Sequence, residues 1–343
     1  MIEQEKEKEV TTSGIKVEMD KETFLGEGKI EQPSGAEVEK ILSDKGFSNI
    51  KFLGRGWSSE AFNAEFEGRD CIIRVPKIGG GGFETYVREH AVLEFIADKI
   101  KSVRIPKTTI CEDDDLVYVV HEKISGNDFN SNNFENLSKA EQENFSRSVA
   151  KFFAELHAID VSGLSEIQGI RWGDISTAFI KASFDNYAKV VQNEGWGSDF
   201  EFSTQEIDKF CDIVEAIVNL DEPEVLLHRD FYHKNFVVDD EMRLAGVFDF
   251  GNSSLANRAI EFKTFIQRLD DGTFIQSPML KKILSHYNQI SGASITFDDI
   301  VNQLKVADAY LITWLVSSDE VINNNKDNLR DCVTKIKQWV NRE

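Results

Sequence analysis

Residues 226–252 read LLHRDFYHKNFVVDDEMRLAGVFDFGN. This stretch holds two short apolar runs, Phe236–Val238 and Leu244–Phe248, separated by the acidic turn Asp239–Glu241. Apolar runs of this length on either side of a polar turn are typical of a β-hairpin. We therefore expect a hairpin whose two ends carry the polar residues of the stretch.

The polar residues at the two ends of this hairpin stand in a specific order. His-Arg-Asp is followed after four residues by Asn, and the hairpin is followed by Asp-Phe-Gly. A hairpin brings its ends together, so Asp230, Asn235 and Asp249 can converge on one small volume with the oxygen ligands that Mg²⁺ prefers. The same order and spacing occur in the catalytic set of kinases. Loop acids beside a buried hairpin are the alternative, but the combination favours phosphoryl transfer.

The composition sets limits on size and partners. The chain has 343 residues, 41% of them apolar, which is enough for one large domain or two moderate ones. Its formal net charge is −21. Nucleic acids and anionic membranes require basic surfaces, so we expect neither as a partner. A cationic small substrate is compatible with this charge, and so is an acidic surface that is merely solvated.

The cysteines indicate a reducing compartment. Cys71, Cys111, Cys211 and Cys332 are scattered and form no Cys-x-x-Cys pair, so neither a zinc site nor a disulfide framework is expected. The chain starts MIEQEKEKEV, unlike the apolar core of a signal peptide, and no long apolar run follows. We therefore expect a cytoplasmic protein.

The N-terminal part of the chain is rich in strand-like runs. Residues 1–33 show no sustained hydrophobic period and are expected to be disordered or loosely packed. Ser34 with Glu37 forms a capping box, which predicts the start of a helix. The strand-like runs that follow are Ile50–Leu53, Ala61–Phe66, Cys71–Val75, Thr108–Cys111 and Leu116–His121.

The turn between the first two runs, LGRGWSSEAF, is a candidate phosphate-binding loop. Gly54 and Gly56 allow backbone N–H groups to approach phosphate oxygens, and Ser58 or Ser59 can add a hydroxyl donor. An ordinary hairpin turn has the same composition, so that alternative stays open. The Gly79–Gly82 run lies after the third strand and is expected to be a flexible connection.

Residues 84–100 are expected to form a helix, because Leu93 and Ile96 share one face of it with Glu89. An ionised carboxylate beside an apolar stripe requires a partner. Arg74, in the strand CIIRVP, is the natural candidate. In kinases, a strand cation that contacts nucleotide phosphates is positioned by such a helix glutamate. The alternative is a surface glutamate at the edge of the stripe.

After Gly126 the pattern becomes helical. Capping boxes at Ser138 with Glu141 and at Ser203 with Glu206 each precede a helical stripe of apolar residues. Further helical stripes cover residues 259–269, 280–290 and 298–317. The C-terminal part is therefore predicted to be mainly helical.

Three segments of the sequence resemble those of a known protein family. They are IIRVP together with Glu89, AKFFAELHAID, and HRDFYHKN with GVFDFG. On these segments the chain resembles the aminoglycoside phosphotransferases from about Gly46 to about Trp314, and also the macrolide phosphotransferases and choline kinases. Among the aminoglycoside enzymes it is most similar to the 2″-type, which shares the strand-Pro-Lys pattern of Val75-Pro76-Lys77.

The resemblance implies an α+β fold of the protein-kinase type with two lobes. The smaller lobe, residues 34–124, would bind the nucleotide and consist of a five-stranded antiparallel sheet with one helix. The larger lobe, residues 125–343, would be mainly helical and carry the catalytic and substrate-binding groups. Residues 1–33 would precede both.

The resemblance also implies a reaction. Asp230 would be the catalytic aspartate that orients the acceptor hydroxyl and takes its proton, with Asn235 and Asp249 as Mg²⁺ ligands. Arg74 would contact the phosphates of ATP or GTP. The product would be a phosphorylated small molecule, and antibiotic resistance is the role of many members of this family.

The remaining implied contacts belong to the purine and the acceptor. The backbone of Glu122 and Ile124 would offer hydrogen bonds to the purine. Glu261 fills the acidic position that the family has after Asp-Phe-Gly. A cationic acceptor suits acids and an aromatic plane, and the candidate contacts are Glu261, Asp270, Asp271, Asp308 and Trp314.

Other functions stay open at this point. A protein kinase shares the same motifs, but about a hundred residues separate the hinge from His228, and no Ala-Pro-Glu segment follows Asp249. A choline or amino-alcohol kinase and a nucleotide-binding pseudokinase are the other candidates. We expect a monomer or a weak dimer.

Overall fold

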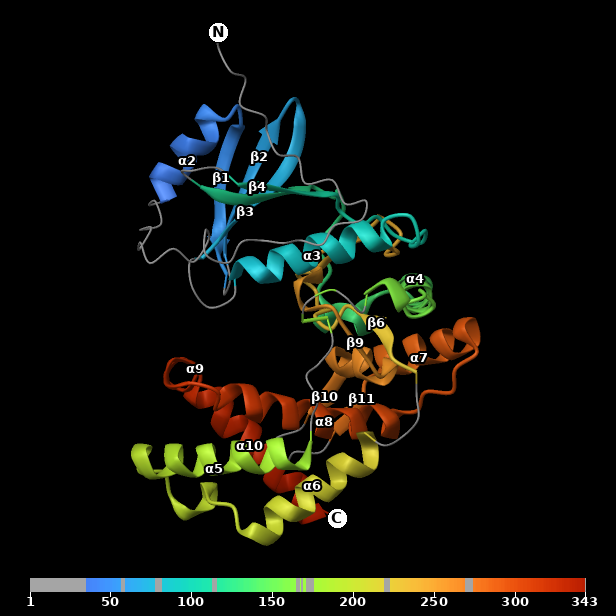
Figure 1. The fold of residues 1–343 in the computed structure, drawn as a ribbon. Helices are drawn as coiled ribbons and strands as arrows, with labels where there is room; N and C mark the ends of the chain where they lie inside the picture. The colour runs from blue at the N-terminus through green and yellow to red at the C-terminus, as the bar shows by residue number, and fades with distance from the viewer. Residues whose placement is uncertain are drawn as a thin grey trace. The chain divides into compact units, whose positions relative to one another are not determined.

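The computed structural model describes residues 35–56, 59–77, 82–112, 116–164, 167, 169–170, 176–218, 223–268 and 274–342 (Figure 1). They divide into two compact units. Unit 1 comprises the described parts of Met1–Ile100, Arg104–Ser125 and Gly246–Asn252. Unit 2 comprises the described parts of Lys101–Val103, Gly126–Ala245 and Ser253–Glu343. The Asp-Phe-Gly segment thus belongs with the N-terminal sheet, whereas the boundary expected from the sequence placed it in the C-terminal part.

Unit 1 is built on a five-stranded antiparallel sheet, which confirms the prediction from the sequence. The strands follow the order β1-β2-β3-β5-β4. Their bounds are β1 (Ser48–Arg55), β2 (Ser59–Phe66), β3 (Arg69–Pro76), β4 (Thr108–Glu112) and β5 (Val117–Glu122). The pairing of β2 with β3 runs without a break from Ser59↔Pro76 to Phe66↔Arg69, which fixes the side of the sheet on which Arg74 lies.

Two helices pack on the sheet of unit 1 (Figure 1). Helix α2 (Gly35–Asp44) buries Val38 and Leu42 in a core that includes Phe62 and Ile73. Helix α3 (Gly82–Ile96) is joined to the sheet by polar contacts: Tyr86 donates to Ser59 Oγ over 2.7 Å, and His90 Nδ1 lies 2.7 Å from Thr108 Oγ1. Because side chains alternate along a strand, Arg74 is separated from the Phe62–Ile73 core and lies on the α3 side, with its guanidinium 5.9 Å from the Tyr86 ring.

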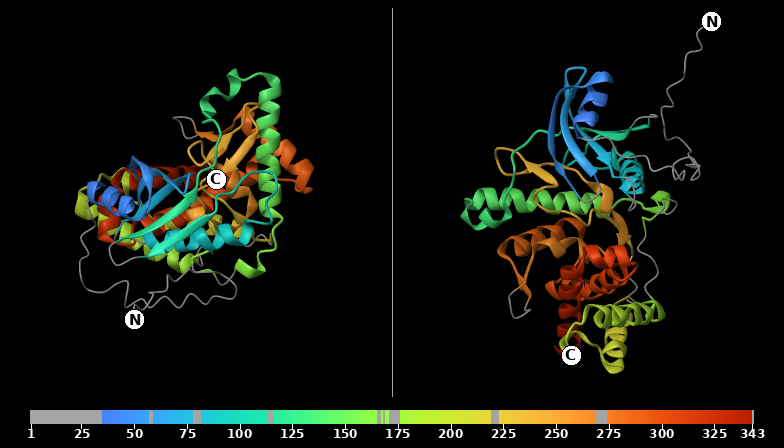
Figure 2. Two further views of the ribbon diagram at one scale, coloured as in Figure 1. Left: turned by 90° about the horizontal axis from the view of Figure 1, so that it is seen from above. Right: turned by 90° about the vertical axis from the view of Figure 1, so that its left-hand side faces the viewer.

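Unit 2 is mainly helical. Its α-helices are α4 (Lys139–His157), α5 (Thr177–Glu194), α6 (Thr204–Val218), α7 (Pro278–Ser291), α8 (Phe297–Leu315), α9 (Asp319–Asn324) and α10 (Lys326–Arg342). Helices α4 and α7 lie side by side (Figure 2). The capping boxes predicted at Ser138 and Ser203 are confirmed by reciprocal hydrogen bonds with Glu141 and Glu206. The one predicted at Ser34 lies outside the described residues. No helix among the residues described is long and apolar enough to cross a membrane.

Short elements connect the helices of unit 2. The 3₁₀ segments are η1 (Ser131–Asn136), η2 (Ser162–Leu164), η3 (Ser198–Phe200) and η5 (Arg258–Phe265), with η4 (Phe250–Asn252) in unit 1. The short strands are β6 (Val225–Leu227), β7 (Phe236–Val238), β8 (Leu244–Val247), β9 (Ser254–Ala256), β10 (Ile266–Arg268) and β11 (Phe274–Gln276). They pair as β6-β9, β7-β8 and β10-β11.

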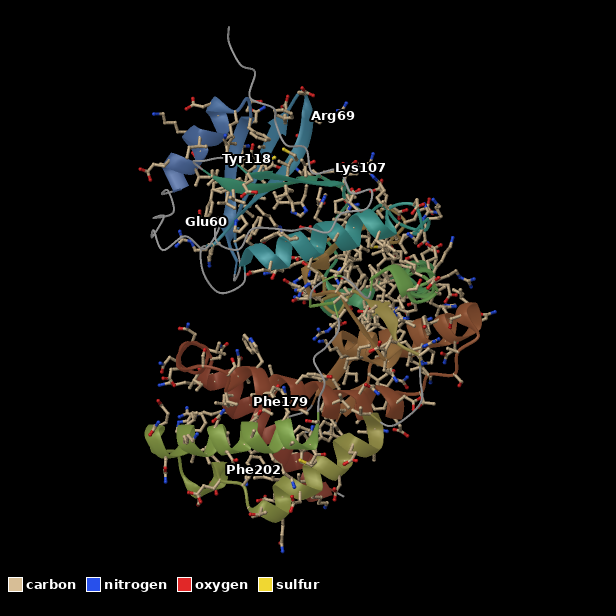
Figure 3. All side chains as sticks on the ribbon, in the orientation of Figure 1. Glu60, Arg69, Lys107, Tyr118, Phe179 and Phe202 are labelled. Carbon is tan, nitrogen blue, oxygen red and sulfur yellow. The ribbon has the colours of Figure 1, made fainter. Side chains whose placement is uncertain are left out.

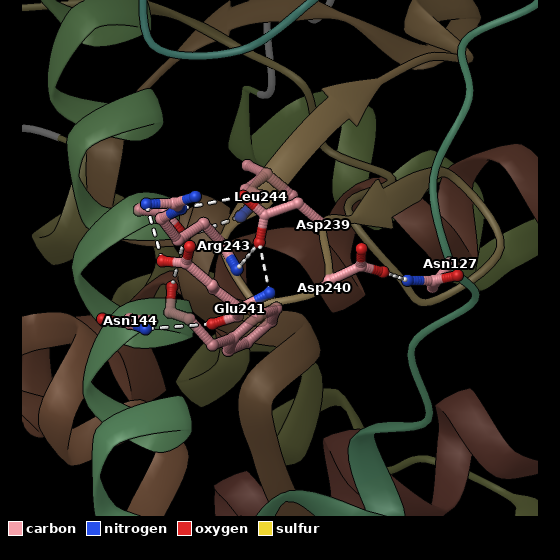
Figure 4. A network of polar contacts seen from close by, with 9 residues as sticks. Asn127, Asn144, Asp239, Asp240, Glu241, Arg243 and Leu244 are labelled. Carbon is pink, nitrogen blue, oxygen red and sulfur yellow. Dashed lines mark hydrogen bonds and ion pairs between the residues drawn. The ribbon is translucent and has the colours of Figure 1, made fainter.

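The hairpin predicted from the sequence is the β7–β8 pair, and its turn is held on two sides (Figure 4). Asp239 Oδ1 accepts the N–H groups of Glu241 and Arg243, each over 2.9 Å. The Glu241 carbonyl accepts from the Asn144 side chain of α4 over 2.9 Å, and Asp240 Oδ1 accepts from the Asn127 side chain over 2.9 Å. The acidic turn therefore fixes the hairpin to two other segments of unit 2.

One predicted helix has a different form. The stripe over residues 259–269 predicted an α-helix, but the structure has η5, a 3₁₀ helix that ends at Phe265, followed by β10. Ala259, Phe262 and Phe265 are buried at a spacing of three residues, which is the repeat of a 3₁₀ helix. The sequence stripe was thus correct about burial and wrong about the helix type.

Gly246 of β8 allows a close contact inside unit 1. A Cβ atom added there would overlap Ile124 Cγ2 and lie 3.3 Å from Ile124 Cβ. We predict that Gly246→Ala lowers the free energy of unfolding by about 1–3 kcal/mol, because overpacking forces neighbouring groups to move. Urea unfolding of Gly246→Ala, Ile124→Ala and the double variant should show that Ile124→Ala removes most of this cost. Gly197→Ala, with no atom within 4 Å of the added Cβ, is the control. A Gly246→Ala protein as stable as the control would contradict the contact.

Candidate active site

The catalytic loop of unit 2 starts where β6 ends. The His228 side chain is fully buried, and its Nδ1 accepts the N–H of Asp230 over 3.2 Å, which puts the ring proton on Nε2. Arg229, between them, has a φ of 68°, in the left-handed region. Such a conformation costs about 1–2 kcal/mol in a residue other than glycine, so the surrounding contacts must stabilise it.

Glu261 of η5 supplies these contacts. Its Oε2 accepts the N–H of His228 over 2.6 Å, and its Oε1 accepts the N–H of Arg229 over 2.9 Å. His157 Nε2 lies 3.6 Å from Oε2, and both side chains are almost completely buried. Burial alone would raise the pKa of Glu261, but His157, His228 and the backbone N–H of Arg229 hold it below its usual value. Glu261 is therefore a buried carboxylate that fixes the loop.

This result corrects one expectation. Glu261 was expected to contact the acceptor, but its side chain is inaccessible and both its oxygens accept backbone N–H groups. An acid placed after Asp-Phe-Gly can be an exposed ligand or a buried support, and the sequence does not distinguish the two. The structure assigns Glu261 to the second role.

Asp230 is held by Asn235 from the other end of the loop. Asn235 Nδ2 donates to the Asp230 carbonyl over 2.8 Å and to Asp230 Oδ2 over 3.2 Å. The next residue, Phe231, is 1% exposed and stacks on Phe236 with ring centroids 4.7 Å apart. The carboxylate of Asp230 is thus presented by a loop whose backbone is bound at Glu261 and whose following side chain is packed in an aromatic core.

Lys263 is a cation near this loop that sequence reasoning missed. Burial lowers the pKa of Lys263, the charge of Arg229 lowers it further, and the charges of Glu261, Asp230 and Asp308 oppose both effects. In the sequence it is one lysine in a short apolar stripe, and no motif contains it. The structure adds it to the charged groups around Asp230.

In unit 1, Asp249 is paired with Arg74. Arg74 Nη2 lies 3.0 Å from Asp249 Oδ2, and the two side chains are 20% and 28% exposed. Asp249 has a φ of 68°, so it is also left-handed. Burial alone would lower the pKa of Arg74, but the carboxylates of Asp249 and Glu89 raise it well above its ordinary value. Arg74 is therefore a firmly charged guanidinium beside a partly accessible carboxylate.

Glu89 contacts the backbone next to Asp249. Its Oε1 accepts the N–H of Phe250 over 3.0 Å, and its side chain is buried. The expected direct pairing of Glu89 with Arg74 is corrected, because the hydrogen-bond partner of Arg74 is Asp249. Burial raises the pKa of Glu89, Arg74 opposes this rise, Asp249 adds to it, and the Phe250 N–H opposes it, with a net value of about 7.

The predicted phosphate loop is the turn between β1 and β2. Gly56 N–H donates to the Ser59 carbonyl over 2.8 Å, and Lys77 Nζ lies 2.5 Å from the Gly56 carbonyl. The Ser59 hydroxyl accepts from Tyr86, which leaves its own proton to donate elsewhere. Gly54 is in β1, and Ser58 lies outside the described residues, as do residues 79–81 of the second glycine run. A phosphate contact at this turn stays a prediction.

The predicted purine hinge follows β5. Glu122 N–H donates to the Lys107 carbonyl over 2.8 Å, and the Glu122 carboxylate lies 2.5 Å from Arg104. Ile124 has a buried side chain, and its backbone N–H and carbonyl have no hydrogen-bond partner within the part of the chain that the structure describes. Ile124 can therefore offer its backbone to a ligand, whereas the N–H of Glu122 is already bound.

The predicted acceptor contacts are placed only in part. Trp314 of α8 is 46% exposed. Asp308 is 8% exposed and accepts from Trp339 Nε1 over 2.9 Å, so one of its oxygens joins α8 to α10. Asp270 and Asp271 lie outside the described residues, as does the segment 1–33. Contact of these residues with an acceptor stays a prediction.

The donor chemistry fits a hard cation. Asp249 offers a partly accessible carboxylate in unit 1, and Asn235 in unit 2 has its Nδ2 bound to Asp230, which leaves an amide oxygen as its ligand atom. Oxygens of these two kinds are those that Mg²⁺ prefers. Groups of three or more His, Cys, Asp and Glu side chains placed to hold a metal do not occur among the residues described. Each residue taken alone offers few ligand atoms, so a cation bound to either would require further oxygens, such as those of phosphates and water.

A two-unit α+β protein with a β3 arginine, a helix glutamate, a His-Arg-Asp loop and an Asp-Phe-Gly segment is a protein of the kinase-like class. Residues 49–289 match the phosphotransferase enzyme family, and the chain belongs to this family. The resemblance noted from the sequence, the fold class and the assignment as a phosphotransferase are thereby confirmed.

Solved structures show the same fold. The gentamicin complex of APH(2″)-IIa has a TM-score of 0.66 and 18% identity, and the match covers 89% of this chain and 97% of that one. ADP-bound APH(2″)-Ib has a TM-score of 0.65 and 18% identity, and the match covers 88% of this chain and 97% of that one. The apo form of a thermostable mutant of APH(4)-Ia has a TM-score of 0.56 and 18% identity, and the match covers 89% of this chain and 98% of that one.

The raised pKa of Glu89 implies that the stability of the folded state depends on pH. The pKa of this carboxyl group is ordinarily 4.5 and is about 7 in the fold, so the folded state binds the proton more tightly. The stabilisation from this proton is complete below pH 4.5 and is lost as the pH rises through about 7. Thermal unfolding midpoints between pH 5 and 8 should therefore fall for the wild type relative to Glu89→Gln. Glu84→Gln, at an exposed position of the same helix, is the control. A difference between wild type and Glu89→Gln that does not vary with pH would contradict the shift.

Proposed function

We propose that the chain transfers the γ-phosphoryl group of ATP or GTP to a hydroxyl of a small, cationic molecule. Membership of the phosphotransferase family supports the reaction class. The observation that carries the proposal is the catalytic loop, where Asp230 is held by Asn235 on one side while Glu261 fixes the backbone before it. A proton acceptor on a fixed backbone is what transfer to a hydroxyl requires.

Asp230 would orient the acceptor hydroxyl and take its proton as the phosphoryl group moves. The hydroxyl has to lie within about 2.6–3.2 Å of a carboxylate oxygen for this transfer. The Asn235 amide donates to Oδ2 over 3.2 Å and so restricts rotation of the carboxylate. Fixing the base before the substrate arrives reduces the reorganisation needed in the transition state.

The nucleotide would exchange partners with the Arg74–Asp249 pair. Arg74 would turn to the phosphates, and Asp249 would become available to a cation, with Asn235 as its second protein ligand. Mg²⁺ bound there would neutralise charge on the phosphates. The ion pair, at 3.0 Å, keeps both groups neutralised until the nucleotide binds. The backbone of Ile124 would receive the purine.

The charge of the chain and its relatives support a cationic acceptor. The net charge is −21, and Trp314 offers an exposed aromatic plane. Similar structures include a streptomycin–ATP complex of APH(2″)-IIa and a GDP and kanamycin complex of APH(2″)-IIIa. Asp270, Asp271 and Asp308 would add attraction to amino groups. The proposed location is the cytoplasm, because the cysteines are scattered along the sequence and form no Cys-x-x-Cys pair.

A transfer screen tests the proposal. The protein would be incubated with γ-labelled ATP or GTP and Mg²⁺ in the presence of aminoglycosides, macrolides, choline, amino alcohols and sugars. We expect label on a cationic acceptor, and added salt should raise its KM because the attraction is electrostatic. Label only on a protein, or only on a neutral acceptor with a salt-independent KM, would contradict the acceptor class. Nucleotide binding without transfer to any compound would indicate a pseudokinase.

Asp230→Asn tests the role of the base. The substitution keeps the shape and the contact with Asn235 but removes the proton acceptor. We predict that kcat falls by about 10²–10⁴-fold, the range for loss of general-base catalysis, while nucleotide affinity changes little. Asp212→Asn, on an exposed position of α6, is the matched control. Transfer by Asp230→Asn at the rate of the control would rule out Asp230 as the base.

A further inference from the structure

Two consecutive residues of η4, Phe250 and Gly251, are bound by α3 inside unit 1. Glu89 accepts the N–H of Phe250 over 3.0 Å. Arg88 donates to the Gly251 carbonyl through Nε over 3.1 Å and through Nη2 over 2.5 Å. We call these contacts, together with that of Thr85 on Gly251, the α3 clamp.

The contact with Thr85 leaves no room for a side chain at position 251. A Cβ atom added to Gly251 would lie 2.8 Å from Thr85 Cγ2, closer than such atoms approach each other. The clamp therefore holds the backbone of Gly251 from two directions, by hydrogen bonds at its carbonyl and by packing at its Cα. A segment held in this way cannot rotate without breaking both kinds of contact.

Arg88 donates two hydrogen bonds from its charged guanidinium to the uncharged carbonyl of Gly251. Such bidentate donation is the usual way in which arginine recognises carboxylates and phosphates. Burial lowers the pKa of Arg88, so its charge has been taken partly out of water to reach this position. A carbonyl in an ordinary turn is satisfied by water or by one N–H, and its stability does not require an arginine.

The segment that Arg88 holds carries a strained residue. Asp249, two positions before Gly251, has a φ of 68°. Strained conformations persist where the surroundings fix them from several sides. Glu89 binds the peptide group between Asp249 and Phe250, and Arg88 binds the one between Gly251 and Asn252. Arg74 binds the Asp249 side chain over 3.0 Å. The direction of the Asp249 carboxylate therefore depends on the clamp.

We infer that Arg88 is a positioning residue that, through the Gly251 carbonyl, fixes the direction in which Asp249 presents its carboxylate to the cation of a bound nucleotide. This inference rests on the proposed function. Supports behind a metal ligand typically change metal affinity by about 10–100-fold when they are removed. Because Arg88 acts through the Gly251 carbonyl, its effect should appear only where the cation takes part in binding.

Calorimetric titration with ADP tests this inference, because it requires neither the acceptor nor turnover. Each protein would be titrated with ADP in excess Mg²⁺ and again in EDTA. The variants are Arg88→Met, which keeps the stem and removes the donors, and Arg88→Lys, which keeps the charge but can donate only one bond to the carbonyl. Arg69→Met is the control, since Arg69 is an exposed residue at the start of β3 (Figure 3).

We expect Arg88→Met to weaken Mg·ADP binding by about 10-fold or more and ADP binding in EDTA by less than about 2-fold. Arg88→Lys should lie between wild type and Arg88→Met in Mg²⁺, and Arg69→Met should match wild type in both titrations. The split between the two titrations is the specific readout, because a role in folding alone would lower both affinities or neither.

Two results would overturn the inference. One is an Arg88→Met protein that binds Mg·ADP as the wild type does, and the other is an equal loss with and without Mg²⁺. If Arg88→Met does not fold, Arg88→Lys decides, and affinities equal to wild type in both titrations overturn the inference. A wild-type protein that binds ADP in neither titration would instead refute the proposed function, and the inference with it.

Discussion

The contact on which the active site depends most is the pair of hydrogen bonds from the His228 and Arg229 backbone to Glu261. Arg229 has a left-handed backbone, which is unfavourable for its residue type, and Glu261 is a carboxylate without access to water. Each is costly alone. Together they are stable, because the buried charge receives two N–H donors and the strained loop receives an acceptor. Asp230, the next residue, is presented by this arrangement.

Unit 1 contains the same combination of a left-handed residue and a buried glutamate that accepts a backbone N–H. Asp249 is also left-handed, and the peptide group that follows it donates to a buried carboxylate, Glu89. In both units, therefore, a buried glutamate accepts backbone N–H groups beside a strained residue. In unit 2 the strained residue, Arg229, precedes the acid Asp230, and in unit 1 the acid Asp249 is itself the strained residue. The two buried glutamates differ in charge balance, since the pKa of Glu261 is lowered and that of Glu89 is raised to about 7.

The features predicted correctly from the sequence are those that depend on residues close together in the chain. The hairpin strands, the two capping boxes and the order of the motifs follow from turns, periods and side chains a few residues apart, and the structure has them. The sequence did not predict Glu261 as a support or Arg88 as a clamp, because those contacts join residues 32 and 163 positions apart. Burial decides such roles, and a single sequence does not show which acids are buried. The stripe at residues 259–269 failed for a related reason, since apolar residues in an α-helix and a 3₁₀ helix produce similar patterns over so few turns.

Buried carboxylates hold the backbone of both acidic segments in place. Amide hydrogen exchange of the wild-type protein, resolved at His228, Arg229 and Phe250, measures this directly. We predict that these three amides exchange as slowly as those of strands β6 and β3, although none of the three lies in a strand. Exchange of the three at the rate of an unprotected loop would contradict it.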